Sequence, residues 1–357
     1  MAPSAAEARC REASVVLPGV DLRNASGIPL VRAAVVQPFL EAARRIGVPV
    51  ESRLRAAGLP ADWVEDDACL LPEINAWDFI QTVTRREGVE NFGALSARAI
   101  PHHEFSTLAP LLAPCATLFD LLKRFIAVAP WQSTVTAYRL VPKPDAVWFT
   151  HTGQRLVPDD VQVSLFQLSG MLQLVRCGAG GNWHPAELHL PFPIQPWMRL
   201  DAEFGRSRLC FSMPSAAFPI PRTLLARPIV PARFDSRENG PRIGPVSSFL
   251  KDQVLEILVS YLGQEDLGVE LISEICGLSP RTLQRRLTLE HTTLSELLDR
   301  ARFEAATRLL METELDLVDI GMTAGYRNHS SFSRAFRRWA GTTPRDFRRR
   351  SRETERA

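Results

Sequence analysis

The last hundred or so residues of this chain contain the same local pattern twice, and this repetition limits the fold more than any other feature. Each copy is a short helix with one apolar face, a glycine turn and a second helix with its own start signal. In the first copy Gly277 supplies the turn, and Ser279 with Pro280 opens the second helix as N-cap and first-turn proline. Leu283 and Leu287 hold that helix against its neighbour. The pattern predicts two helices that cross at a tight turn.

The second copy follows one longer helix, which is predicted over residues 295–311. We expect Asp316 to cap the next short helix, Gly325 to form the turn, and Ser330 or Ser331 to cap the final helix. Three aromatic side chains at helical spacing anchor that helix: Phe332, Phe336 and Trp339. No strand-like alternation interrupts this region, so it is predicted to be all helical.

The second helix of each copy turns hydrogen-bonding side chains outward near its N-terminal end. In the first copy these are Arg281, Thr282, Gln284 and Arg285, and in the second His329, Ser330, Ser333 and Arg334. Arginine and glutamine side chains match the exposed edges of guanine and adenine in the major groove. Other cations are placed to meet phosphates: Arg286, Arg337, Arg338 and Arg345. The pattern is typical of helix-turn-helix units that bind double-stranded DNA.

Spacing and charge support this interpretation. Arg285 and Arg334 are 49 residues apart, so one helix and its flanking turns join the two units. Two such units would reach major grooves about one turn (~34 Å) apart. The chain has a formal net charge of only +2, yet residues 327–350 hold eight Arg and one acid, Asp346. The alternative is a charged solvent face on ordinary helix pairs, and the repetition argues against it.

The remainder of the chain reads as an α+β domain. Helices are predicted over 35–57 (interrupted at Gly47), 72–86, 117–127 and 160–176, a hairpin over 133–151, and strands over 187–192 and 208–212. The predicted parts are a flexible tail (1–27), an effector-sensing or dimerisation domain (28–227), a Pro- and Gly-rich linker (228–248), the DNA-binding domain (249–350) and a tail (351–357).

Residues 249–350 resemble the DNA-binding domain of the AraC/XylS family of bacterial regulators. The matching strings are SPRTLQRRL at 279–287, LLDRARFEAATRLL at 297–310 and AGYRNHSSFSRAFRRWAGTTPRDFR at 324–348. The resemblance implies base contacts by the polar sets named above, except Thr282, and it also implies RNA polymerase as a partner. Two positions depart from the family pattern: His291 replaces a usual glycine, and Gly321 replaces a usual alanine. We expect both departures to affect stability more than DNA reading.

The first domain resembles the arabinose-binding-type domain of the same family, at FLEAARRIGVPVESRLRAAGLP (39–60) and RSRLCFSMPSAAFPIPRTLLARPI (206–229). The resemblance implies effector sensing, homodimerisation or both, and it does not define the effector. Four aromatic residues are candidates for an effector pocket: Trp131, Tyr138, Trp148 and Phe166. Core packing explains the same four residues equally well.

The sequence carries no recognisable catalytic chemistry. We find no GxSxG elbow and no phosphate-binding glycine loop, so no catalytic residue and no cofactor is expected. His102, His103 and Glu104 lie on a loop without further metal ligands, and His184 and His189 are expected to pack or hydrogen-bond, so no metal is predicted. No signal peptide or membrane segment is expected.

The leading interpretation is therefore a cytoplasmic, effector-responsive transcription regulator, and activation is favoured over repression. Two alternatives stay open: a ligand-independent dimeric DNA-binding regulator, and an enzyme domain fused to a DNA-binding domain.

Overall fold

The computed structural model describes residues 28–59, 66–99, 108–153, 161–229, 243–262 and 267–355. The chain divides into two compact units. Of the described residues, those from Pro29 to Val246 belong to unit 1, and Ile28 with those from Ser247 to Glu355 belongs to unit 2. Among the described residues, none of the helices combines the length and the apolar character needed to span a bilayer.

Unit 1 mixes helices with short strands, which confirms the predicted α+β class. Its helices are α2 (Ala33–Arg45), α3 (Val50–Ala56), α4 (Glu73–Glu87), α5 (Phe92–Ala99), α6 (Ala109–Leu112), α7 (Leu118–Val128), α8 (Val161–Ala179) and α9 (Arg222–Leu225), with 3-10 turns η4 (Ala129–Trp131) and η5 (Pro196–Arg199). Its strands are β1 (Leu30–Arg32), β2 (Leu70–Pro72), β3 (Thr136–Pro142), β4 (Ala146–Gly153), β5 (Glu187–His189), β6 (Arg208–Cys210) and β7 (Ala216–Pro221).

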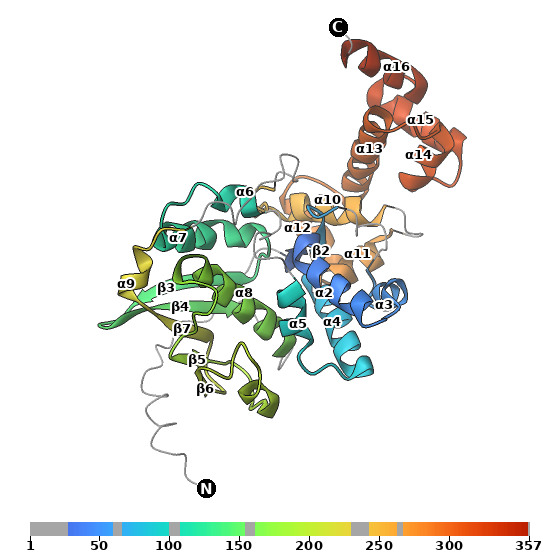
Figure 1. Cartoon of the computed structure of the whole chain (residues 1–357). Helices are drawn as coiled ribbons and strands as arrows, with labels where there is room; N and C mark the ends of the chain where they lie inside the picture. The colour runs from blue at the N-terminus through green and yellow to red at the C-terminus, as the bar shows by residue number, and fades with distance from the viewer. Residues whose placement is uncertain are drawn as a thin grey trace. The chain divides into compact units, whose positions relative to one another are not determined.

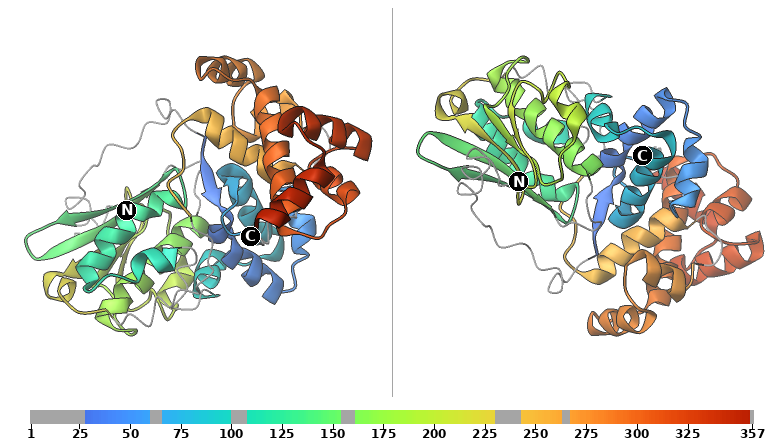
Figure 2. Two further views of the ribbon diagram at one scale, coloured as in Figure 1. Left: turned by 90° about the horizontal axis from the view of Figure 1, so that it is seen from above. Right: turned by 90° about the horizontal axis from the view of Figure 1, so that it is seen from below.

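The strands form an antiparallel pair, β1–β2, and a five-stranded sheet in the order β3-β4-β7-β5-β6. The predicted hairpin is confirmed as β3–β4, at the edge of unit 1 away from α2–α5 (Figures 1 and 2). Strand β7 is not predicted, because Pro219 and Pro221 are unusual in a strand with neighbours on both sides. The two prolines are tolerated here because β7 pairs with β4 along its length but with β5 only at Ala217.

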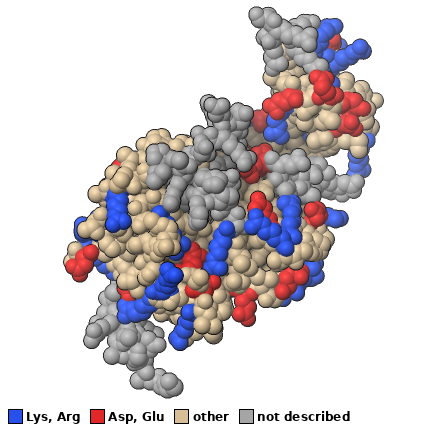
Figure 3. All heavy atoms as spheres, viewed as in Figure 1, with Lys and Arg blue, Asp and Glu red and all other residues tan. Residues whose placement is uncertain are grey.

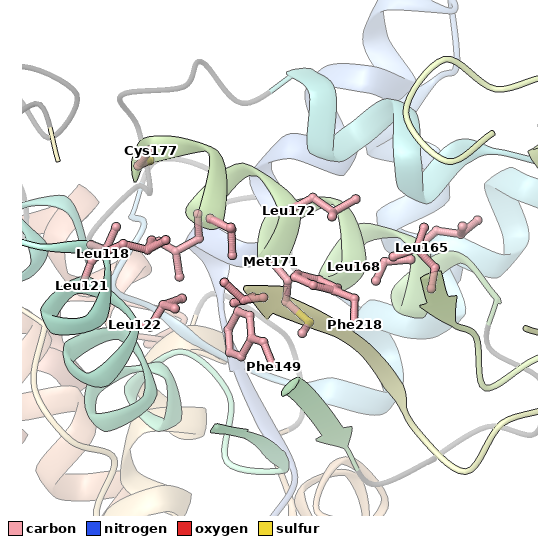
Figure 4. Close-up of a cluster of buried hydrophobic side chains, with 14 of the residues drawn as sticks. Leu118, Leu121, Leu122, Phe149, Leu165, Leu168, Met171, Leu172, Cys177 and Phe218 are labelled. Atoms are coloured by element: carbon pink, nitrogen blue, oxygen red, sulfur yellow. The ribbon is translucent and has the colours of Figure 1, made fainter. Parts of the chain in front are cut away.

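Two large apolar cores lie among the described residues of unit 1. The larger lies between the sheet and helices α7 and α8, where Leu121, Leu168 and Phe149 point toward one another (Figure 4). The second joins α2, α3, α4 and α5 around Phe39, Phe79 and other residues that are fully buried. The two cores share a unit because α8 contributes to both.

Helices α5 and α8 cross so closely that Gly93 has no room for a side chain. A Cβ atom there would lie 1.9 Å from the carbonyl oxygen of Gln162. The Gln162 side chain completes the contact, since its Oε1 accepts from the Gly93 N–H at 2.8 Å and its Nε2 donates to the Glu90 carbonyl at 2.8 Å. These contacts hold α5 and α8 together at the junction of the two cores.

The described part of unit 2 is entirely helical, as predicted. Its helices are α10 (Leu250–Tyr261), α11 (Val269–Ile275), α12 (Pro280–Leu289), α13 (Leu294–Glu312), α14 (Leu317–Thr323), α15 (His329–Ala340) and α16 (Pro344–Glu355). Helix α16 continues through residues 351–355, beyond the predicted end of the DNA-binding domain at residue 350. Pro344 opens this helix, and the hydroxyl of Thr343 accepts from the Asp346 N–H at 3.2 Å.

Candidate DNA interface and effector residues

The first recognition helix, α12, starts as its sequence predicts. Ser279 is the N-cap, and its Oγ accepts from the Thr282 N–H at 3.2 Å. Gly277 takes the left-handed conformation (φ +63°) that turns the chain from α11 into α12. Leu283 and Leu287 are fully buried, so the helix is held by one apolar face.

The opposite face of α12 presents long donors to solvent. Arg281, Gln284 and Arg285 are exposed, whereas Arg286 is half-buried. Thr282 differs from the other predicted base contacts, because its hydroxyl lies 2.8 Å from the Ser279 hydroxyl and belongs to the cap. Three of the predicted base-contact side chains of α12 are therefore accessible from solvent.

The end of α12 is tied to the start of α10. The carboxylate of Glu290 accepts hydrogen bonds from the Leu250 N–H at 3.0 Å and the Lys251 N–H at 2.8 Å. A carboxylate at this place also suits the positive end of the α10 dipole. The next residue, His291, has φ +58°, which confirms that it adopts the left-handed conformation expected of a glycine substitute. Glu290 was not singled out from sequence, because its partners lie about forty residues away.

The second recognition helix, α15, begins two or three residues earlier than predicted. The N-cap is Asn328, whose side-chain oxygen accepts from the Ser331 N–H at 2.9 Å. Ser330 and Ser331 therefore lie in the first turn, and the predicted serine cap is wrong. Phe332 and Phe336, four residues apart and fully buried, form the apolar face of this helix.

Gly321 lets α14 and α15 pack closely. A Cβ atom at this position would lie 3.2 Å from both Cβ and Cγ of Phe332, closer than side chains normally approach. The glycine thus has a packing reason that the sequence pattern did not reveal.

The polar face of α15 is shorter in reach than that of α12. His329, Ser330 and Arg334 are exposed, and the Ser333 hydroxyl lies 3.4 Å from the His329 Nε2. Arg334 donates through Nε to the Ser330 carbonyl at 3.4 Å, a weak contact that DNA could replace.

The predicted phosphate contacts have different surroundings. Arg337 and Arg345 are exposed. Arg338 donates to Asp299 on α13 at 2.8 Å, in a solvent-exposed ion pair. Exposed ion pairs of this kind contribute little to stability, so a DNA phosphate could displace Asp299 from Arg338. On the face of unit 2 shown in Figure 3, basic and acidic side chains are interspersed, which fits the small net charge.

Helix α13 sets the distance between the two recognition helices. Thr293 and Glu296 form a reciprocal capping box at its start. Its 19 residues span roughly 28 Å at about 1.5 Å per residue. In Figure 1 it runs from the group of α10, α11 and α12 to the group of α14, α15 and α16. This length is close to one turn of B-DNA, about 34 Å.

The four aromatic candidates for an effector pocket are not brought together. Tyr138 lies opposite His151 in the sheet, and His151 is three residues from Trp148 on β4, so Tyr138 and Trp148 occupy opposite faces. Phe166 packs on Phe39 in the other core, with ring centroids 4.6 Å apart. Trp131 is half-buried beside the larger core.

Buried polar residues surround Tyr138 instead. The His151 ring lies 4.8 Å from the Tyr138 ring, and its buried Nε2 has no hydrogen-bond partner among the described residues. Burial lowers the pKa of His151 to about 4, so the imidazole is neutral at pH 7. Burial, and then the nearby Glu73 carboxylate, raise the pKa of Tyr138. Glu73 in turn accepts from the Ser133 hydroxyl at 3.3 Å.

Sequence reasoning missed this group because its members come from α4, the segment before β3, and β4. Periodicity gives no sign that Glu73 and His151 both lie near Tyr138. Glu73 gives no signal in the sequence either, because an acidic residue in the first turn is an ordinary feature of a helix N-terminus.

Comparisons with known proteins agree with this architecture. A family model described as the N-terminal arabinose-binding domain of AraC transcription regulators matches residues 47–229, and a helix-turn-helix domain model matches residues 272–350. The first match covers more than half of the chain. The chain therefore belongs to the AraC family of transcription regulators, and it is a DNA-binding protein.

Individual relatives are more distant. The chain is 22% identical over 334 residues to the transcriptional regulator VirS of Mycobacterium tuberculosis, covering 89% of this chain and 96% of VirS. It is 40% identical over 70 residues to the ornithine utilization regulator of Pseudomonas aeruginosa, which is 20% of this chain and 21% of that protein. The crystal structure of CdpR from Pseudomonas aeruginosa aligns with 84% of this chain and 96% of its own, at 18% identity and a TM-score of 0.35.

Replacing His291 by glycine is expected to stabilise unit 2. A non-glycine residue in the left-handed region costs roughly 1–2 kcal/mol, and a glycine would remove this strain. Glycine also gains freedom in the unfolded chain, which offsets about 0.5–1 kcal/mol of the stabilisation. We expect His291→Gly to raise the free energy of unfolding of a 247–357 fragment by about 0.5–1 kcal/mol in urea denaturation.

The matched control is Gly277→Ala, at φ +63°. It should lower the same free energy by about 1 kcal/mol, because alanine is strained there. Equal or lower stability of His291→Gly would contradict the assigned strain.

Proposed function

We propose that this regulator binds two successive major grooves of DNA with α12 and α15. In the second part of the proposal, it activates transcription in response to a small effector bound by unit 1. The observation that carries the first part is the pair of capped helices with exposed donors, joined by α13. Each recognition helix is buried on one face and polar on the other, so its position within unit 2 is fixed while its donors stay accessible.

The two helices are proposed to divide the work. The first offers Arg281, Gln284 and Arg285, whose long side chains can bond base edges in pairs or bidentately. The second offers mainly short groups, with Arg334 as its long base-reading donor. Arg337 and Arg338 follow one turn later and suit the phosphate backbone. We infer that α12 supplies most of the sequence discrimination and α15 relatively more backbone affinity.

The effector is proposed to bind near His151, Tyr138 and Glu73. A buried polar atom without a partner is rare in folded proteins and needs a reason. A ligand group that donates to or accepts from the His151 Nε2 would supply one. The neutral imidazole and the buried carboxylate favour a small polar molecule over a purely apolar one.

Further features of the proposal follow from family membership. Homodimerisation through unit 1, contact with RNA polymerase, location in the cytoplasm and lack of enzymatic activity are each part of it. The relatives found by comparison are transcription regulators, which supports a non-enzymatic role. The ligand-independent dimeric regulator is the main alternative, and an enzyme fusion is the less favoured one.

Effector binding separates the leading function from the ligand-independent alternative. A thermal-shift screen of the full chain against amino acids, amines, sugars and lipids should reveal compounds that raise the melting temperature of unit 1. His151→Phe keeps a ring and removes the nitrogen, so it should abolish the shift.

Trp148→Phe, on the opposite face of the sheet, is the matched control and should retain the shift. A library without any stabilising compound would favour the ligand-independent alternative. A compound whose shift survives in His151→Phe would place the effector elsewhere.

The division of work between the helices predicts different outcomes for two arginines. Arg285→Ala should cost about 1–3 kcal/mol at the preferred site and relax the preference at one or two base positions. Arg337→Ala should weaken all sequences similarly and reduce the slope of log affinity against log salt by about one phosphate contact.

The measurement is binding of each variant to a randomised site library at two salt concentrations. Arg337 is chosen over Arg338 because the ion pair of Arg338 with Asp299 would complicate the comparison. If Arg337→Ala changed the preferred sequence while Arg285→Ala left it intact, the proposed division would be reversed.

A further inference from the structure

Three side chains with metal-binding chemistry meet at the edge of the five-stranded sheet. Glu187 and His189 lie on β5, and Cys210 lies on β6. The two strands are parallel, with His189 opposite Cys210 and Glu187 opposite Arg208. Because residues two apart on a strand share a face, all three side chains point to the same side. Their candidate ligand atoms all lie within 4.8 Å of one another.

The imidazole of His189 is buried, at 6% exposed, yet its Nε2 has no hydrogen-bond partner among the described residues. The nearest acidic group is Glu187, whose Oε1 lies 3.8 Å from that nitrogen, too far for a hydrogen bond. Cys210 is also buried, at 8% exposed.

Surrounding residues hold the cluster in place. Glu187 uses Oε2 for an ion pair with Arg208, which leaves Oε1 on the side of His189. The Trp148 ring packs against the imidazole, with centroids 4.6 Å apart. Supporting contacts of this kind orient the ligands of natural metal sites.

We propose that Glu187, His189 and Cys210 bind a thiophilic divalent cation of the Zn²⁺ class, with a fourth position open to water or another ligand. One sulfur, one imidazole nitrogen and one carboxylate oxygen form a donor set that Zn²⁺ prefers. With metal–ligand bonds of about 2.0–2.3 Å, tetrahedral ligands lie roughly 3.3–3.6 Å apart, so small side-chain rotations close the site. The thiolate and carboxylate together balance the charge of the ion.

Binding would convert the Cys210 thiol to a thiolate, forming one metal–sulfur bond and releasing one proton to solvent. The site lies on the same sheet face as Trp148, opposite to His151, so it is distinct from the proposed effector residues. The proposal does not depend on DNA binding or on the effector. Sequence reasoning treated His189 as a packing residue because Cys210 is remote along the chain.

The test is a titration of the chelator-treated full chain with Co²⁺, a spectroscopic stand-in for Zn²⁺. We expect one ion per chain, a thiolate-to-cobalt charge-transfer absorption, displacement by Zn²⁺ and release of about one proton per ion. A wild-type chain without the charge-transfer absorption would overturn the proposal.

Variants assign the ligands. Cys210→Ser is close in size to the wild type and should abolish the charge-transfer absorption, whereas Cys115→Ser, a half-buried thiol before α7, should retain it. His189→Gln should weaken Zn²⁺ binding at least about 100-fold. Loss of a residue that only orients a metal ligand can already weaken binding by up to about 100-fold, and His189 is proposed as a ligand itself. Far-ultraviolet circular dichroism checks that each variant is folded. Retention of the absorption in Cys210→Ser would also overturn the proposal.

Discussion

The DNA interface depends on the packing of α13. This helix contacts α10 on one side of unit 2 and α14 and α16 on the other, so both recognition helices are positioned relative to it. Ala301, Ala305 and Ala306 line its buried face, and small side chains let neighbouring helices approach closely. Because α13 has a fixed length, the offset between α12 and α15 is built into the fold and needs no DNA to create it.

Two local contacts transmit that order to the recognition helices. Glu290 ties the end of α12 to the start of α10. Gly321 brings α14 against Phe332, at the base of α15. Neither contact involves the exposed donors of α12 and α15. Stability and sequence discrimination are thus assigned to different residues of the same unit.

Much of unit 2 could be predicted from sequence because its signals are local. The Ser279 cap, the Gly277 turn and the Asp316 cap each depend on residues within a few positions. The cap of α15 is not predicted correctly because Asn328, Ser330 and Ser331 are all good N-cap residues, and the local sequence does not choose among them. The pairing of Arg338 with Asp299 spans 39 residues, so no local pattern could reveal it.

The sites of unit 1 were far less predictable. The aromatic residues were visible as a composition, yet strand register places Tyr138 and Trp148 on opposite faces. The buried polar residues around His151 and the cluster around His189 are assembled by long-range strand and helix contacts. Strand β7 is hidden in the sequence by two prolines, which the strand tolerates because it pairs with β5 only at Ala217.

The most direct test of the account is a base-by-base interference footprint of the full chain on a site selected from random DNA. The account predicts two groups of major-groove contacts on one face of the duplex, about one helical turn (10–10.5 base pairs) apart. Arg285→Ala should remove contacts in one group only, and Arg334→Ala contacts in the other only. A single group of contacts, or two groups unaffected by these variants, would contradict it.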